Sequence, residues 1–356
     1  MKKGVLLLFG VLLCHHASAT DVVADATAKF LAGLPVRGTP LESRSLDPQW
    51  ATHAADMDHA WDRLEQEQLS KIRSWAPQYL GDSYTDSAPV FYMFSGPDLL
   101  YAHNFFPDAA IYILCGTEPV GPIPNIEHTP TDALDSALAN LRKSLDSVLS
   151  WSFFITKQMR INLTHTELSG TLPLLYVFIA RVGGTIESTS LVSLGRDGNI
   201  GESGDGNIPG VKIVFTDSGG REQTLYYFST DLSNDGISSD PGLMKFCARL
   251  APGVSFLKAA SYLMHENGFS FVRDFLLQHS KLILQDDSGI PYRCFGNETW
   301  NVRFCGNYVG PIEIFKQYWQ PDLEAVYANS RPSALDFGFG YRWQPNSSLL
   351  MIATRK

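Results

Sequence analysis

The chain has 356 residues, of which 44% are hydrophobic, and its 28 Lys and Arg against 37 Asp and Glu give a formal net charge of −9. This acidic balance argues against nucleic acid and anionic membranes as partners, because both repel a negatively charged surface. Beyond a short apolar run at the N-terminus, no stretch approaches the roughly 18 apolar residues of a membrane span, so we expect no integral membrane segment in the mature protein.

The N-terminus has the pattern of a secretory signal peptide. Lys2 and Lys3 precede an apolar run over residues 5–13, and Ala17-Ser18-Ala19 supplies the small residues that signal peptidase recognises. We therefore expect cleavage after Ala19 and a periplasmic or secreted mature protein. Loss of the two lysines would bring its net charge from −9 to about −11.

The first predicted elements are helices. A short helix is expected over residues 25–34. Asp47 and Pro48 are typical of the start of a second helix, because Asp caps a helix N-terminus and Pro fits the first position. Apolar residues at helical spacing then predict one long helix from about 48 to 76, ending before Pro77. Residues 20–86 are thus predicted to be an N-terminal helical segment, followed by an α/β domain over residues 87–356.

The α/β domain opens with a strand, helix, strand unit. An apolar run over residues 90–94 predicts a strand, followed by a turn at 95–98 and an amphipathic helix to Phe106. A second apolar run over 110–115 predicts a strand that ends at Gly116-Thr117-Glu118. This order is the first half of a layered α/β fold.

The remaining elements complete an α/β pattern. Leucines at steps of four and three predict a helix over 134–148, the apolar run 172–180 suits a central strand, and alternating stretches between 185 and 231 predict antiparallel strands. Helices are then expected over 254–266, 269–279 and 313–327, a strand over 282–284, a hairpin around 300–308, and short strands over 337–343 and 349–354. The predicted fold class is α/β, with a three-layer, Rossmann-like central sheet and an antiparallel β insertion at about 185–231.

Polar residues gather where three of the predicted strands end. The carboxyl ends of parallel strands meet at one edge of a sheet, and open α/β sheets bind their ligands there. These residues are therefore predicted to bind a ligand: Ser95, Gly96 and Asp98 after the first strand, Glu118 after the second, and Asp286 and Ser288 after the strand over 282–284.

The same edge has candidate catalytic residues. Converging carboxylates raise one another's pKa, which suits acid/base chemistry, or they hold a hard cation. The candidates are Asp98, Asp286 and Asp287, with His103 and His265 as base or ligand. In the alternative, Asp98 caps its helix, the two other aspartates form a turn, and the histidines are ordinary helix residues. No metal ligands are assigned, since no spacing resembles a zinc site, and the cofactor stays unknown.

Four cysteines follow the signal peptide. Cys294 and Cys305 flank a turn, and an exported compartment permits disulfides, so a bridge between them is predicted. Cys115 and Cys247 lie in apolar runs and are either buried thiols or a second bridge.

Several segments resemble known families. FSGPD, GTEPVGPIP, LILQDDSGIPYR and the closing FGFGYRW are similar to segments of a family of uncharacterised exported bacterial proteins, which implies a bacterial, periplasmic or secreted setting and no particular activity. A weaker likeness is to the class I methyltransferase core, in which a Gly-rich turn follows the first strand and an acidic residue ends the second. Glu118 matches the acidic position, whereas the turn at 95–98 has one glycine where that core usually has two or three.

Three functions are compatible with these patterns. The first is an envelope protein that binds a small polar ligand or a partner protein without chemistry. The second is a hydrolase that uses carboxylates with His103 or His265, with or without a divalent cation. The third, more distant, is a methyltransferase-like protein.

Overall fold

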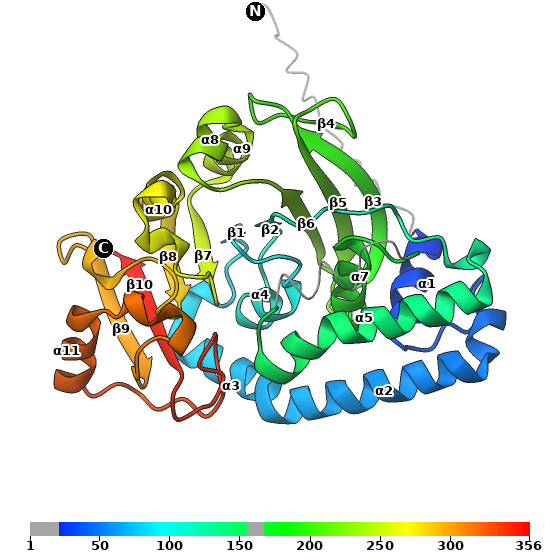
Figure 1. The fold of residues 1–356 in the computed structure, drawn as a ribbon, viewed down its shortest axis with the longest axis horizontal. Helices are drawn as coiled ribbons and strands as arrows, with labels where there is room; N and C mark the ends of the chain where they lie inside the picture. Colours follow the sequence, from blue (N-terminus) through cyan, green and yellow to red (C-terminus); the bar gives the residue numbers. More distant parts are fainter. Residues whose placement is uncertain (1–20, 155–166) are drawn as a thin grey trace, which may run out of the picture.

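The computed structural model describes residues 21–154 and 167–356, so the predicted signal peptide lies outside the described residues. The described chain is a mixed α/β structure built on one ten-stranded sheet, in the order β4-β3-β5-β6-β2-β1-β7-β8-β10-β9 (Figure 1). Its five central strands run parallel. In sheet order they are β6 (Glu222–Ser229), β2 (Ile111–Gly116), β1 (Val90–Tyr92), β7 (Gly253–Leu257) and β8 (Ser280–Gln285).

Antiparallel strands flank this parallel centre on both sides. Beside β6 lie β5 (Ile208–Thr216), β3 (Thr185–Leu194) and β4 (Ile200–Glu202), each antiparallel to its neighbour. Beside β8 lie β10 (Leu349–Arg355) and β9 (Trp300–Gly306), with β10 antiparallel to both of its neighbours. The alternating sequence between residues 185 and 231 therefore forms strands, as its period of two predicts. Strands β3, β4 and β5 pair antiparallel, but β6, which the predicted antiparallel insertion included, runs parallel to β2 and belongs to the centre of the sheet.

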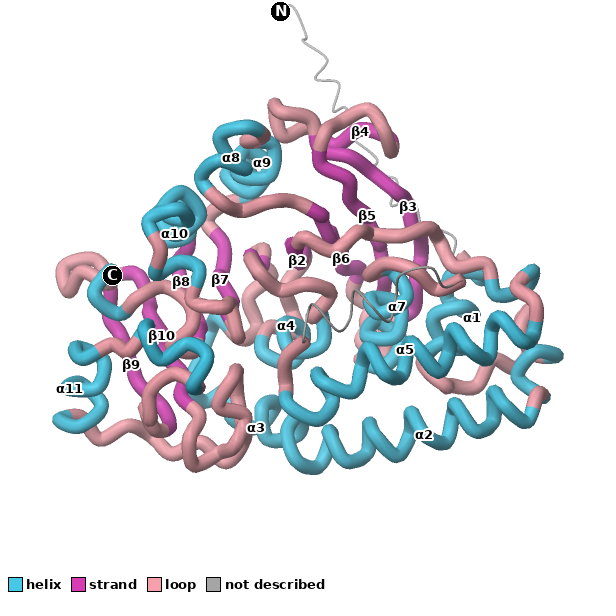
Figure 2. Tube along the Cα trace, viewed as in Figure 1, coloured by secondary structure: helices cyan, strands magenta, loops and turns pink. Residues whose placement is uncertain are grey.

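Helices pack in two groups, because successive strand residues point to opposite faces. Tyr92 and Leu114 belong to one buried cluster, and Phe91 and Ile113 to another. The first cluster includes residues of α1 (Val22–Leu31), α2 (Pro48–Leu64), α3 (Ser70–Leu80), α4 (Leu99–Phe105), α5 (Thr131–Trp151) and α7 (Leu172–Arg181). The second includes residues of α8 (Asn234–Ser239), α9 (Gly242–Leu250) and α10 (Ser270–His279), while α11 (Pro321–Asn329) packs on β10 (Figure 2).

The predicted long N-terminal helix is present but longer and less regular. Asp47 caps α2 by accepting a hydrogen bond from the backbone N–H of Gln49, as predicted. A π-helical turn at Glu65–Leu69 separates α2 from α3, and α3 continues through Pro77 to Leu80. The expected end before Pro77 was wrong, because Trp75 and Tyr79 stack across it at 4.7 Å and the helix stays packed on the core.

Two predicted elements have the wrong type. Residues 172–180 form the buried helix α7, not a central strand, because an apolar run has no periodicity that separates a buried helix from a buried strand. The predicted helix over 254–266 is instead strand β7 followed by a short 3-10 turn, Leu263–His265. All five residues of β7 are buried, so its sequence lacks the alternation of apolar and polar residues that would have identified a strand.

The C-terminal region also differs from expectation. β9 pairs with β10 instead of forming a local hairpin around 300–308. The helix expected over 313–327 is divided into a 3-10 segment, Glu313–Tyr318, and α11, which begins at Pro321. Residues 337–343 contain one isolated bridge between Phe339 and Arg342 instead of a strand, whereas β10 confirms the strand predicted over 349–354.

The predicted disulfide is absent from the described residues. Cys115, Cys247, Cys294 and Cys305 are all free thiols. Cys305 lies in the same buried cluster as Tyr92, and Cys294 packs against the cluster on the opposite face of the sheet, so the sheet separates the two sulfurs. Proximity along the chain predicted a bridge, but the two cysteines pack on opposite faces of the sheet.

Within ranges 21–154 and 167–356, no helix has the length and apolar character needed to span a membrane.

Candidate functional site

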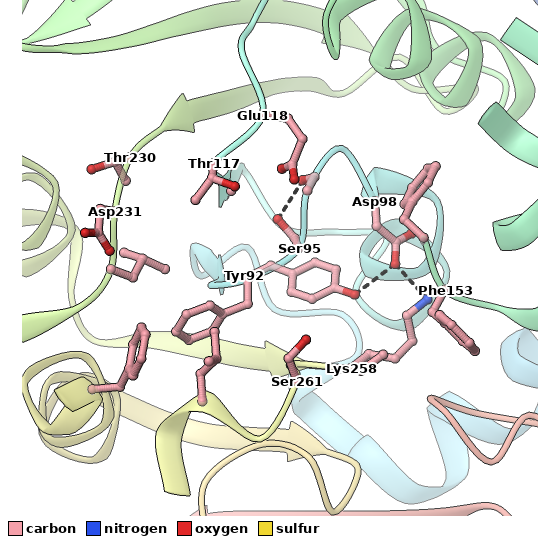
Figure 3. A pocket seen from close by; sticks show the side chains of 18 of the residues that line it. Tyr92, Ser95, Asp98, Thr117, Glu118, Phe153, Thr230, Asp231, Lys258 and Ser261 are labelled. Carbon is pink, nitrogen blue, oxygen red and sulfur yellow. Dashed lines mark hydrogen bonds and ion pairs between the residues drawn. The ribbon is translucent and has the colours of Figure 1, made fainter. Parts of the chain in front are cut away.

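A cavity of about 220 Å³ lies at the carboxyl ends of β1, β2, β6 and β7, and we call it the carboxyl-end pocket (Figure 3). Its polar lining comes from the segments that follow these strands: Ser95 and Asp98 after β1, Thr117 and Glu118 after β2, Thr230 and Asp231 after β6, and Lys258 and Ser261 after β7. The pocket therefore lies at the sheet edge that was predicted from the sequence. Four of the predicted binding residues line it, namely Ser95, Gly96, Asp98 and Glu118.

Aromatic rings form much of the remaining wall. Phe94 meets Phe269 at 5.9 Å between ring centroids, and Phe153 meets Tyr341 at 5.0 Å. These rings come from four separate segments of the chain. The polar residues at the predicted strand ends therefore gave no indication that aromatic side chains would line the site. A cavity with aromatic walls and a few polar groups has the character of a small-molecule site.

The turns after β1 and β2 approach each other at two glycines. A Cβ at Gly116 would lie 2.4 Å from Glu118 Oε2 and 3.2 Å from the Cα of Gly96, so a larger residue would displace this carboxyl group. Ser95 joins the two turns, since its Oγ accepts from the Cys115 N–H at 3.1 Å and donates to the Gly96 carbonyl at 2.8 Å. Ser95 and both glycines thus place the buried Glu118 carboxyl group at the pocket.

A buried ion pair crosses the pocket floor between β1 and β7. Lys258 Nζ lies 2.7 Å from Asp98 Oδ2, with side chains only 1% and 3% exposed. The Tyr92 hydroxyl donates to the same carboxylate oxygen at 2.8 Å, and Asp98 Oδ1 accepts from the Tyr101 N–H at 3.2 Å, which caps α4. Burial lowers the pKa of Lys258, and the adjacent Asp98 opposes that shift.

Asp98 therefore caps α4, which was the alternative interpretation of this residue, while its cationic partner was missed. Lys258 follows β7 directly, but residues 254–266 were expected to be helical, so no strand end was anticipated there. The one available signal is a lysine directly after the buried stretch GVSFL.

Backbone strain is concentrated around the pocket. The described non-glycine residues with positive φ are Phe94, Ser152, Ala259, Ser261 and Tyr262, with φ between 51° and 65°. Each lines the pocket or is next in sequence to a residue that does. Such conformations cost about 1–3 kcal/mol each and persist where the surroundings fix them, often at functional sites.

The residues that follow β8 do not line the pocket but form hydrogen bonds to the segment after β7, part of which does line it. Asp286 Oδ2 accepts from the Ala259 N–H at 3.0 Å, and Ser288 Oγ accepts from the Ala260 N–H at 2.7 Å. Asp287 Oδ2 accepts from the Tyr262 hydroxyl at 2.7 Å. These three predicted site residues therefore hold the strained segment after β7 in place.

Burial raises the pKa of Asp286, and burial together with the Asp286 charge raises the pKa of Asp287 to about 7. Since Asp287 in an unfolded chain titrates near pH 4, the folded protein binds one more proton between about pH 4 and 7, and stability falls as pH rises through this window. Asp287→Asn is expected to reduce this dependence and to stabilise the protein relative to wild type above pH 7. Urea unfolding of the wild type and the variant at pH 5 and pH 8 measures how the stability of each depends on pH. Equal pH dependence in the two proteins would contradict the raised pKa of Asp287.

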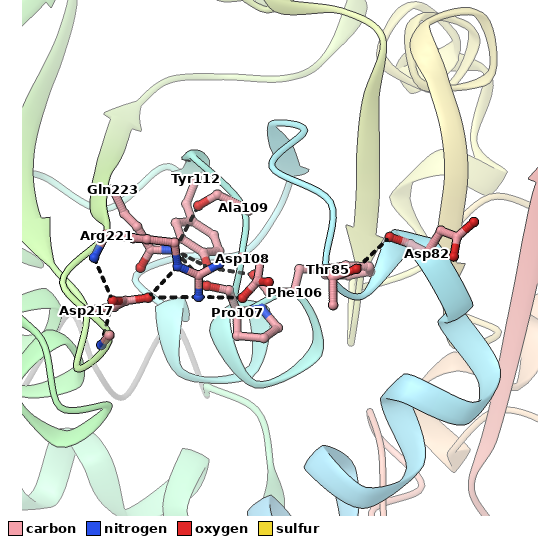
Figure 4. A network of polar contacts seen from close by, with 11 residues as sticks. Asp82, Thr85, Phe106, Pro107, Asp108, Ala109, Tyr112, Asp217, Arg221 and Gln223 are labelled. Atoms are coloured by element: carbon pink, nitrogen blue, oxygen red, sulfur yellow. Dashed lines mark hydrogen bonds and ion pairs between the residues drawn. The ribbon is translucent and has the colours of Figure 1, made fainter.

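His103 lies at the opposite end of the sheet from the pocket. Its ring meets that of Tyr112 at 6.0 Å, and burial lowers its pKa to about 4. The neighbouring Gln223 amide donates to the carbonyls of Pro107 and Ala109, just before β2 begins. In the same region Arg221 bridges Asp108 and Asp217 (Figure 4).

His265 is nearer the pocket but does not line it. Its ring packs against those of Tyr262 and Tyr318, at 5.3 and 5.6 Å, and burial lowers its pKa to about 4. Neither predicted histidine is thus brought beside Asp98. Among the described residues, no group of three or more His, Cys, Asp or Glu is arranged to hold a metal ion.

Comparison of the chain with protein-family models, curated proteins and solved structures gives no match. The resemblance of its segments to exported bacterial proteins stays a prediction. Its function must therefore be inferred from the pocket.

Proposed function

We propose that this protein is a binding protein whose carboxyl-end pocket holds a small polar ligand with neighbouring hydroxyl groups and a flat ring, the chemistry of a nucleoside. The observation that carries the proposal is the carboxyl group of Glu118, which follows the second parallel strand and faces an aromatic-walled cavity. A carboxylate in this position accepts hydrogen bonds from ribose hydroxyls in Rossmann-like proteins.

A Rossmann-like, three-layer centre is part of the proposal. Numbered by their order in the chain, the five parallel strands from β6 to β8 run 3-2-1-4-5. In such sheets ligands bind outside the carboxyl ends, where the strand order reverses. Here the reversal falls at β1, and the segments after β1 and β7 meet beneath the pocket through Asp98 and Lys258. On this view β3, β4 and β5 are an antiparallel insertion before the third parallel strand.

The pocket wall suits such a ligand. Phe94 and Phe269 supply one aromatic surface, and Phe153 and Tyr341 another, on which a flat ring can stack. The hydroxyl groups of Thr117 and Ser261 add polar contacts at the same cavity. A few oriented polar groups in an apolar wall give specificity without requiring catalysis.

Binding is favoured over the alternative of a carboxylate and histidine hydrolase. His103 lies at the opposite end of the sheet, and Asp98 is held by Lys258 and Tyr92. Asp286 is held by the backbone of Ala259. A general base needs to reach the proton that it removes, and neither His103 nor His265 lines the pocket.

A methyltransferase-like protein is a second candidate, favoured by the strand order. Counting β9 and β10 with the five parallel strands gives 3-2-1-4-5-7-6, with the seventh strand antiparallel, which is the order of the class I methyltransferase core that the sequence resembles. S-adenosylmethionine contains a nucleoside and would use the same Glu118 contact.

The proposal is tested by a thermal-shift screen of wild-type protein with adenosine, guanosine, uridine, S-adenosylmethionine, sugars and divalent cations. At least one nucleoside is expected to raise the melting temperature, because a ligand at about 100 times its Kd stabilises the folded state by about 2.7 kcal/mol. A larger shift with S-adenosylmethionine than with adenosine would favour the second candidate. No shift with any nucleoside or sugar would overturn the proposed function.

A further inference from the structure

We infer that the carboxyl-end pocket accepts neutral or cationic nucleosides and rejects their phosphorylated forms. This inference rests on the proposed function, and it adds the charge of the ligand.

The one basic side chain among the described lining residues is already fully engaged. Lys258 Nζ lies 2.7 Å from Asp98 Oδ2, donates to the carbonyl of Ser152, and lies 3.4 Å from the centre of the Tyr101 ring. An ammonium group has three N–H donors, and these contacts account for all of them. Lys258 therefore has no donor left for a phosphate.

Two positions in the turn after β1 offer no backbone donor to a phosphate. The N–H of Gly96 donates to the Cys115 carbonyl at 3.2 Å, and Pro97 has no N–H. Phosphate groups bind at helix N-termini because unpaired N–H groups point at them. Here Asp98 accepts from the Tyr101 N–H and places a negative charge at the start of α4.

The charge of the lining also disfavours an anion. Among the described lining residues, Asp98, Glu118 and Asp231 are acidic, and Lys258 is basic. An anion that enters loses its hydration and lies near these carboxylates in a partly enclosed site, whereas a cation is attracted to them. Selection by charge follows from these residues together, not from any one of them.

Calorimetry with three matched probes tests the inference: adenosine, adenosine 5′-monophosphate, and 5′-amino-5′-deoxyadenosine, which carries an ammonium group in place of the phosphate. The monophosphate is expected to bind at least about tenfold more weakly than adenosine, and the amino compound at least as tightly as adenosine. Equal or tighter binding of the monophosphate would overturn the inference and leave the proposed function intact. Binding of none of the three, together with no thermal shift for any other nucleoside or sugar, would overturn both.

A charge substitution at the pocket gives a second readout. Thr117 is an exposed lining residue, so Thr117→Lys adds a cation without touching the buried ion pair. Thr117→Lys is expected to strengthen binding of the monophosphate relative to adenosine, so that the ratio of adenosine affinity to monophosphate affinity falls by about tenfold. Thr52→Lys, the same change on an exposed residue of α2, is the matched control and should leave the ratio unchanged. An unchanged ratio in Thr117→Lys, or an equal change in both variants, would contradict selection by the pocket's charge.

Discussion

Lys258→Met is expected to lower the free energy of unfolding by about 3–5 kcal/mol, because it leaves the buried Asp98 carboxylate without its counter-charge. Asp98→Asn should have a comparable effect, since it leaves a buried ammonium group with the Ser152 carbonyl and the Tyr101 ring. The double variant is expected to lose less than the sum of the two, because it removes both charges together. Urea unfolding of the four proteins measures the coupling.

An exposed ion pair provides the matched control. Lys316 and Glu313 lie 2.6 Å apart with side chains 72% and 82% exposed, and such pairs contribute about 0–1 kcal/mol. Lys316→Met should therefore change stability little. If Lys258→Met were no more destabilising than Lys316→Met, the ion pair would not be the fixed floor of the pocket described above.

Glu118→Gln is expected to weaken adenosine binding by about 10- to 100-fold, because hydrogen bonds to a charged group contribute about 1.5–3 kcal/mol. The substitution preserves the size of the side chain, which the close approach of Gly116 and Gly96 requires. Calorimetry with adenosine measures the loss, and urea unfolding checks that the variant is folded.

Glu127→Gln is the control for this variant, because Glu127 is an exposed residue that does not line the pocket. It should bind adenosine as the wild type does. Wild-type affinity in Glu118→Gln, or an equal loss in both variants, would remove Glu118 from the binding site.

The first strand, helix, strand unit could be predicted because its signals are local. A buried strand, the turn at 95–98 and the capping Asp98 adjoin one another in the sequence, and the structure has them in that order. Glu118 could be placed at the pocket for the same reason, since it follows the next strand. Signals within about ten residues were enough to find Ser95, Asp98 and Glu118 among the polar residues of the lining.

Other parts of the lining depend on contacts distant in the sequence. Strand β7 is buried throughout and has no alternation, so its end was not recognised and Lys258 was missed. Lys258 meets Asp98 across 160 positions, a pairing that no local pattern encodes. The apolar run of α7 is also buried and shows no periodicity, so α7 was mistaken for a strand. The aromatic walls come from segments far apart in the sequence, so they were not foreseen.

Asp286 and Ser288 show where the prediction was correct in position but incomplete in role. They follow β8 at the expected edge of the sheet. However, β7 lies between β8 and β1, so their side chains reach the backbone of Ala259 and Ala260 instead of the cavity. One unrecognised strand was enough to move predicted ligand contacts to a supporting position.

The most direct test of the central claim is a crystal structure of the protein grown with adenosine. The account predicts the nucleoside in the carboxyl-end pocket, with its ribose hydroxyls within hydrogen-bond distance of the Glu118 carboxyl group and its base against the aromatic wall. Adenosine bound elsewhere, or a pocket without adenosine at saturating concentration, would contradict it.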